Sequence, residues 1–281
     1  MSEPEPERTR PFPAPVRMDG YLAWTWRLFR ACGLRLAPLY VAGVATVLLL
    51  HFGVVVFMLE VLEVAESVEA LAASFAAQVT FSTVGGTLLA AIAAPVFVEQ
   101  VAGHRAGTDS GWRRLRPKLG HVVVSGLYVA MPLLMLVLFV GQITQLALLP
   151  AVLGPPVLVH AIVWEKLYFR DAATRAKNLL AGQWGRVLSA LVVLAVGPAL
   201  LQLVVLALLD QVLPDLTRGG LAGSLWAALT IAATTAPVWL FTSAAGTVAY
   251  LDLRARFEEL DPEALEAEVA AATAEEAPSP G

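Results

Sequence analysis

Four histidines, one cysteine and scattered acidic residues are the side chains of this chain that could do chemistry. Nucleophilic catalysis needs a Ser or Cys beside a positioned base, but no GxSxG motif occurs and Cys32 has no histidine near it in sequence. Metal-dependent hydrolysis needs clustered ligands such as HExxH, whereas the histidines occupy four separate segments: His51, His104, His121 and His160. We therefore predict no catalytic residue, no metal, no cofactor and no enzymatic activity.

The composition indicates a membrane protein. Of the 281 residues, 58% are hydrophobic and 15% are charged, whereas soluble domains are about half apolar and about a quarter charged. The excess lies in runs long enough to cross about 30 Å of hydrocarbon, at 38–60, 79–101, 121–141, 145–164, 187–209 and 223–250. These runs predict an all-α bundle of six transmembrane helices, which prolines kink.

Lysine and arginine predict the orientation of the bundle. Every such residue except Arg218 lies in a terminal segment or in the second-to-third or fourth-to-fifth connection. The positive-inside rule makes that side cytoplasmic, so both termini are expected inside. A composition rich in Ala, Leu, Val and Arg and poor in Lys points to a bacterium. We therefore expect a multi-pass protein of the bacterial cytoplasmic membrane.

Three regions follow one another along the chain. Residues 1–17 alternate proline with charge and predict a disordered cytoplasmic arm. Residues 18–260 form the predicted six-helix transmembrane domain. Residues 261–281 are acidic and rich in alanine, and predict a mostly disordered cytoplasmic tail. This tail starts as a helix, with Asp261 as N-cap and Pro262 at the first helical position.

Short segments at the predicted cytoplasmic boundary mix tryptophan with arginine: 19–35, 109–119 and 171–186. They predict helices in the membrane interface whose basic sides face anionic headgroups, so the expected partner is the bilayer and not nucleic acid. Each segment precedes an outward span and an inward span, and each inward span ends at an acid: Glu99, Glu165 and Asp252. The order fits either a threefold repeat or a chance recurrence. We expect these acids to meet arginines of the interfacial helices and to fix the cytoplasmic layer of the bundle.

The end of the sixth run places charges one helical turn apart. Asp252 and Arg256 have the i, i+4 spacing with the acid first, which is the favoured order. Arg254 and Glu258 have the same spacing in the reverse order, and the Tyr250 ring lies one turn before Arg254. This pattern predicts a structural anchor at the membrane surface and not an active site.

Two polar side chains fall inside predicted spans. Intramembrane ionisable groups are costly and often functional, so His51 is either a functional group or a neutral imidazole bonded to a neighbouring helix. The same alternatives apply to Gln202, for which we expect an interhelical hydrogen bond.

Several stretches resemble a family of six-span bacterial integral membrane proteins. The family is similar to the membrane domain attached to some glycerophosphodiester phosphodiesterases. The resemblance is carried by the connection "GHRAGTDSGWRRLRPKLG", by the ending "YLDLRARFEELD", and by Glu165, Ala172, Arg175, Leu179, Gly182 and Arg186. The chain departs from the family pattern at Ala176 and Trp184. The resemblance implies six helices and interfacial segments, but not the phosphodiesterase activity, which belongs to a separate barrel domain.

Three functions fit these features. The first is a non-enzymatic scaffold or assembly factor that gathers an unidentified protein partner on its basic cytoplasmic face. The alternative is a carrier or channel for a lipid or small amphiphile, which a hydrated path lined by His51, Gln202 and Glu99 would favour. A membrane-embedded enzyme for lipid headgroups ranks third, and it would need His104 or His121 beside Glu99.

Overall fold

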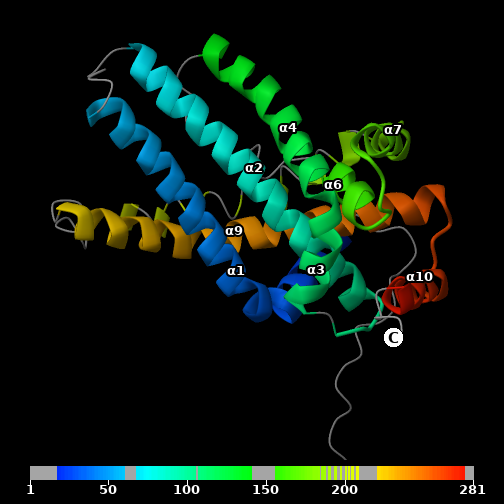
Figure 1. Cartoon of the computed structure of the whole chain (residues 1–281). Coiled ribbons are helices and arrows are strands. Elements are labelled where there is room, and N and C mark those ends of the chain that lie inside the picture. The colour runs from blue at the N-terminus through cyan, green and yellow to red at the C-terminus, as the bar shows by residue number, and fades with distance from the viewer. Residues whose placement is uncertain are drawn as a thin grey trace, which may run out of the picture.

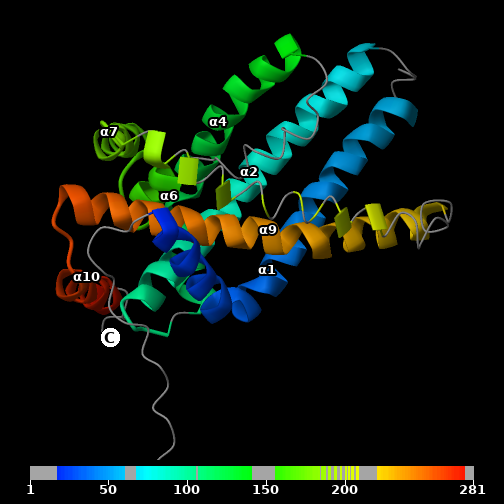
Figure 2. The same ribbon diagram turned by 180° about the vertical axis from the view of Figure 1, so that it is seen from behind.

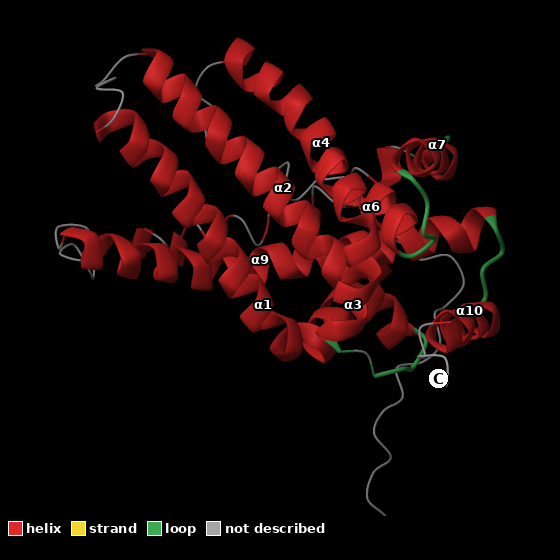
Figure 3. Cartoon of the chain, in the orientation of Figure 1, coloured by secondary structure: helices red, strands yellow, loops and turns green. Residues whose placement is uncertain are grey.

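The computed structural model consists of helices joined by turns and loops in the part of the chain that it describes, and that part contains no strand (Figures 1 and 3). The long helices are α1 (Met18–Glu60), α2 (Val68–Val101), α4 (Leu119–Val140) and α9 (Gly220–Phe257). The short ones are α3 (Thr108–Leu115), the 3-10 helix η1 (Arg116–Lys118), α6 (Pro156–Val163), α7 (Phe169–Leu180) and α10 (Pro262–Glu275). The described residues are 18–60, 68–105, 107–140, 156–183, 220–275 and, in between, 185–187, 189, 190, 193, 194, 197, 200, 202, 204, 205, 207 and 208.

Among the residues that the structure describes, three helices are long and apolar enough to cross a membrane. The qualifying segments are Gly20–Phe57 of α1, Ala72–Val101 of α2 and Leu229–Phe257 of α9. The predicted all-α fold is confirmed for the described residues. The predicted spans 145–164 and 187–209 include many residues outside that part, so six spans and the orientation remain predictions.

One continuous helix, α1, replaces the separate interfacial segment 19–35 and first span 38–60 that the sequence predicts. Pro38 lies inside this helix, where the missing N–H and the ring bend the helix axis. Figures 1 and 2 show the dark-blue first part of α1 turning away from the rest. Buried side chains follow one side of the helix across Pro38, and this packing keeps the helix intact: Tyr21, Leu28, Leu36 and Tyr40.

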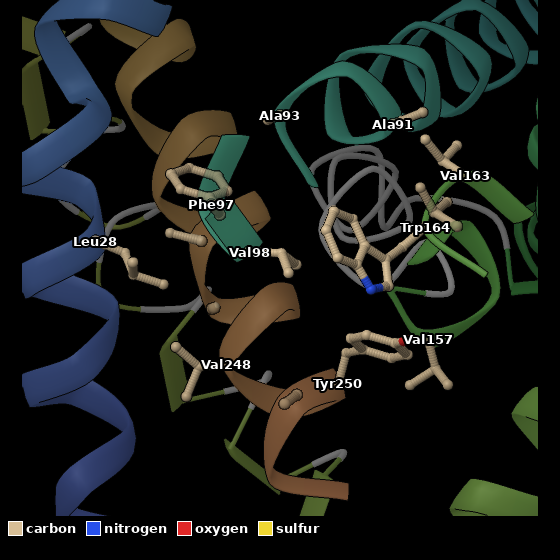
Figure 4. Packing of buried hydrophobic residues seen from close by; sticks show 14 of the residues in the cluster. Leu28, Ala91, Ala93, Phe97, Val98, Val157, Val163, Trp164, Val248 and Tyr250 are labelled. Carbon is tan, nitrogen blue, oxygen red and sulfur yellow. The ribbon is translucent and has the colours of Figure 1, made fainter. Parts of the chain in front are cut away.

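The core lies where the ends of three helices meet. Every residue is buried in the stretches 91–99 of α2, 157–164 of α6 and 244–253 of α9. Helix α9 packs against α1, α2 and α6, and Figure 4 shows Phe97 and Tyr250 with neighbouring apolar side chains in this interior. Each stretch ends at one of the predicted boundary acids or within one residue of it. The best-packed part of the molecule therefore positions those acids.

Two short helices pack on this end of the bundle. Helix α3 lies so close to α2 that a Cβ at Gly111 would be 2.0 Å from the Ile92 carbonyl oxygen, so only glycine fits there. Helix α7 packs on α6, and it buries residues at helical spacing, namely Ala172, Ala176, Leu179 and Leu180. The two helices overlap the predicted segments 109–119 and 171–186 but each begins one or two residues earlier, and they deliver arginines to the acids.

The acidic tail differs from the mostly disordered segment that its composition predicts. Residues Pro262–Glu275 form helix α10, and its start agrees with the prediction, because the Ala264 N–H donates to the Asp261 carboxylate at 2.7 Å. Leu265 and Val269, which lie one turn apart, are both buried. This small apolar stripe is the sequence signal that a composition-based reading overlooks.

Candidate functional site

The predicted boundary acids join a network of ion pairs and hydrogen bonds at one end of the bundle, which we call the charged layer. Its members are Tyr21, Glu99, Arg114, Trp164, Glu165, Arg175, Arg186, Tyr250, Asp252, Arg254, Arg256, Glu258 and Glu268. The boundary acids come from α2, from the turn after α6 and from α9, whereas Glu258 directly follows α9 and Glu268 lies in α10. Most of the cations come from α3, α7 and α9. The layer therefore connects elements that are distant in sequence.

Glu99 makes the most buried ion pair of the charged layer. The Arg114 Nη2 of α3 donates to Glu99 Oε1 at 3.1 Å, and the two side chains are 2% and 9% exposed, arginine first. The Arg114 guanidinium also lies 4.3 Å from the centroid of the Trp164 ring, where the π face attracts a cation. The site thus fixes α3 across both α2 and the end of α6.

Glu165 is held by a tight turn and by two donors. Beyond α6 the Leu167 N–H donates back to the Ala161 carbonyl at 3.1 Å, and Lys166 adopts a left-handed φ of 57°, as in the helix ends that usually employ glycine. This turn presents Glu165 to the Arg175 Nε at 2.8 Å and to the Tyr250 hydroxyl at 2.7 Å. Helices α6, α7 and α9 are joined at this one carboxylate.

Asp252 is completely buried and accepts hydrogen bonds from two helices. The Tyr21 hydroxyl of α1 donates to Oδ2 at 2.5 Å, and the Arg256 Nε donates from one turn later in α9 at 3.1 Å. The Arg186 Nε lies 3.7 Å from the same Oδ2. Asp252 therefore ties the first turn of α1 to the last turns of α9.

The contacts follow the order of the three predicted units of the sequence, each made of an interfacial segment, an outward span and an inward span that ends at a boundary acid. Glu99 of the first unit meets Arg114, which opens the second unit, and Glu165 of the second meets Arg175, which opens the third. Asp252 of the third unit meets Tyr21, which opens the first. Each acid thus contacts the helix that begins the next unit. The contact of Asp252 with Tyr21 connects the third unit back to the first, so the three contacts form a closed circle.

The one-turn contacts predicted from the C-terminal spacing are all present. Arg256 bonds Asp252, the Arg254 Nε donates to Glu258 at 2.8 Å, and the Arg254 guanidinium lies 5.7 Å from the Tyr250 ring centroid. Glu258 also pairs with Arg175 of α7. Partial burial alone would raise the pKa of Glu258, but the hydrogen bonds and charges of the two arginines outweigh it and hold that pKa below its usual value.

Helix α10 docks on the charged layer through an acid that sequence reasoning missed. Glu268 receives both terminal nitrogens of Arg254, at 3.0 and 2.9 Å, and the indole N–H of Trp164. Near the end of the helix, Glu275 pairs with Lys166. The negative tail therefore covers cations at the ends of α6 and α9. Only the Leu265 and Val269 stripe in the sequence signals this docking.

The two intramembrane polar residues differ in their surroundings. The Gln202 Nε2 donates to the Thr235 hydroxyl of α9 at 2.6 Å, and both residues are buried, which is the expected interhelical bond. The half-buried His51 lies in α1, and its buried Nδ1 has no hydrogen-bond partner among the described residues. The predicted bond from a neutral imidazole to a neighbouring helix is therefore not found for that nitrogen.

The other histidines do not assemble into a catalytic cluster in the described part of the chain. The His121 ring packs edge-on against Tyr168, with centroids 5.1 Å apart, whereas the Glu99 carboxylate faces Arg114. His160 was missed as a core residue: it stacks on Tyr250 and its Nε2 lies 2.9 Å from the Thr247 hydroxyl. Among the described residues no three His, Cys, Asp or Glu side chains come together as metal ligands.

A cavity of about 640 Å³ adjoins the charged layer. It lies between the first part of α1, the described residues of 185–208 and the middle of α9, and its lining is almost entirely apolar. Tyr21, whose hydroxyl bonds Asp252, lines the cavity, and so does Gln202. The sequence marks Trp26 only as an interfacial residue, whereas the structure places it in the cavity wall.

The roles of the charged layer and the cavity have to be argued from their own chemistry. The resemblance of residues 18–261 to six-span bacterial membrane proteins stays a prediction from short sequence motifs. No protein-family model, curated protein or solved structure matches the chain.

Proposed function

We propose that the chain is an integral protein of a bacterial cytoplasmic membrane, with six spans and both termini inside. The three apolar helices α1, α2 and α9 support membrane insertion. The charged layer supports the orientation, because it gathers arginines of α3, α7 and α9 at one end of these helices, as the positive-inside rule requires of a cytoplasmic end. The six-span family that the motifs resemble has the same architecture.

Within the membrane the protein acts as a non-enzymatic scaffold or assembly factor. The observation that carries this proposal is the closed circle of acid contacts, Glu99 with Arg114, Glu165 with Arg175 and Asp252 with Tyr21. Donors from neighbouring helices occupy these carboxylates, so they suit holding helices better than exchanging protons with a substrate. Beside the charged layer, η1 and α7 carry exposed cations, Arg116 and Lys177, which in this orientation face the cytoplasm.

Co-purification from lipid discs tests the scaffold. The wild-type chain is extracted with its native lipids, and stoichiometric proteins and lipids are identified by mass spectrometry. A variant with R116Q and K177Q removes two exposed charges, and the matched control with R116K and K177R keeps them. A scaffold should retain one stoichiometric protein in the wild type and the control but not in the neutralised variant. Discs without such a protein, or equal amounts of that protein with the neutralised variant and the control, would overturn the proposal.

A carrier for a lipid or small amphiphile is the second candidate, and the apolar cavity is the observation that favours it. The hydrated path expected for a carrier would be lined by His51, Gln202 and Glu99. Of these, Glu99 bonds Arg114 and Gln202 bonds Thr235 instead. One enriched lipid without a protein partner in the same lipid discs would favour the carrier over the scaffold.

A further inference from the structure

The cavity between α1, residues 185–208 and α9 has the lining of a hydrocarbon site. Its wall on α1 carries Trp26 and Phe29, which stack with centroids 5.5 Å apart, and Phe29 meets the edge of Phe241 from α9 at 5.7 Å. Val193 and Gly197 line the third wall. Rings and aliphatic groups of this kind attract an apolar ligand and give a polar solute no partner.

The polar side chains of Gln202 and Thr234 in the lining already make hydrogen bonds within the protein. Gln202 lies in the lining, but its amide nitrogen donates to the Thr235 hydroxyl, and Thr234 donates to backbone carbonyls of its own helix. A ligand that enters this far gains apolar contacts without needing polar groups of its own. An alkyl chain meets this condition, and a sugar or an amino acid does not.

The dimensions of the cavity fit an acyl chain. Its lining on α1 runs from Tyr21 to Phe29, which along this helix corresponds to about 12 Å at about 1.5 Å per residue. One leaflet of a bilayer is about 15 Å of hydrocarbon, so most of the length of a lipid chain fits along the cavity.

Positive charge lies at the end of the cavity that adjoins the charged layer. The Arg186 guanidinium is 5.9 Å from the ring centroid of Tyr21, which lines the cavity. Guanidinium groups pair well with phosphate oxygens, so this end suits the headgroup of a lipid whose chain lies among the rings.

We infer that the cavity binds an acyl chain of an anionic phospholipid from the surrounding bilayer, with its phosphate beside Arg186. The inference rests on the proposed membrane insertion but not on the scaffold role. Gly197 offers a direct way to block the cavity, because a Cβ there meets no atom within 4 Å. A leucine at this position therefore fills the cavity without displacing the backbone.

Lipid retention in native mass spectrometry tests the site. The protein is reconstituted in discs of equal phosphatidylglycerol and phosphatidylcholine, transferred to detergent, and the bound lipids are counted. The wild type should keep one phosphatidylglycerol, and G197L should reduce its retention about tenfold, since excluding two methylenes of the chain costs about that much affinity. G53L is the matched control, because the Cβ of Gly53 also meets open space and this residue does not line the cavity; it should retain the lipid.

Two further variants separate the chain site from the headgroup site. V193W also occupies the cavity and should reproduce the loss if G197L folds poorly. R186Q should bind both phospholipids alike, because the guanidinium beside Tyr21 is removed. Equal retention by G197L, V193W and G53L overturns the chain site, and a wild type without headgroup preference overturns the anionic assignment. A dimer in the wild type that G197L dissociates would show that a second copy fills the cavity instead.

Discussion

Replacing Asp252 with asparagine tests the charged layer at its most buried acid. The amide has nearly the shape of the carboxylate, and it keeps one oxygen for the Tyr21 hydroxyl. The change removes the negative charge that faces Arg256 at 3.1 Å and Arg186 at 3.7 Å. D252N therefore isolates the electrostatic part of these contacts from packing.

The burial of the partners sets the size of the effect. Removing one partner of a fully buried pair costs about 3–5 kcal/mol, and an exposed pair contributes about 1 kcal/mol or less. Asp252 is fully buried, but Arg256 and Arg186 are 25% and 27% exposed, so water solvates part of the charge left behind. We expect D252N to lower the free energy of unfolding by about 2–3 kcal/mol.

Unfolding by SDS titration in mixed micelles, followed by tryptophan fluorescence, measures this loss. E258Q is the control, because Glu258 is 26% exposed and Arg254 keeps Glu268 when that acid is neutralised; it should cost about 1 kcal/mol or less. Combining D252N with R256Q should cost less than the sum of the two. The reasoning would be refuted if D252N lowered the free energy of unfolding no more than E258Q does. It would also be refuted if the loss in D252N simply added to the losses in R256Q and in R186Q.

Three further changes test other parts of the structure. G111A should destabilise the bundle by about 2 kcal/mol or more, because its methyl group meets the Ile92 carbonyl, whereas G120A, which meets open space, should not; equal effects would contradict the close helix contact. E268Q should speed amide hydrogen exchange across 262–275, since α10 loses its charged anchor, and unchanged exchange would refute that anchoring. The lowered pKa of Glu258 means that its contribution is present above the usual carboxyl pKa of about 4.3 and is lost as pH falls through the folded value. E258Q should therefore flatten the acid side of a stability-against-pH curve, and an unchanged acid side would show that other groups determine it.

The sequence carries the local part of the charged layer. One-turn spacing depends only on the helix geometry, so Asp252 with Arg256 and Arg254 with Glu258 were predictable once a helix was assumed. An ion pair between an interfacial helix and the acid after α6 was expected, because boundary acids need cations nearby, but Arg175 was not predicted to be the partner of Glu165. Which arginine meets which acid depends on how the helices pack, and spacing along the chain does not encode it.

Features that depend on tertiary contacts were predicted poorly. Pro38 was expected to separate an interfacial helix from a span, but packing on both sides of the proline holds α1 together as a bent helix. The tail was judged by its acidic, alanine-rich composition, whereas burial of Leu265 and Val269 and the bond from Trp164 to Glu268 order it. The cavity forms between three separate segments of the chain, so no local sequence pattern predicts it.

The charged layer and the cavity depend on each other through Tyr21. Its ring lines the cavity and its hydroxyl bonds Asp252, which lies 231 residues later in the chain. Apolar contacts alone are non-directional and would let the first part of α1 slide along α9, whereas a hydrogen bond to a buried carboxylate fixes its register. Trp26 and Phe29 follow Tyr21 on the same helix, so that register also sets the aromatic wall of the cavity. The layer that holds the bundle together thereby gives the proposed lipid site its shape.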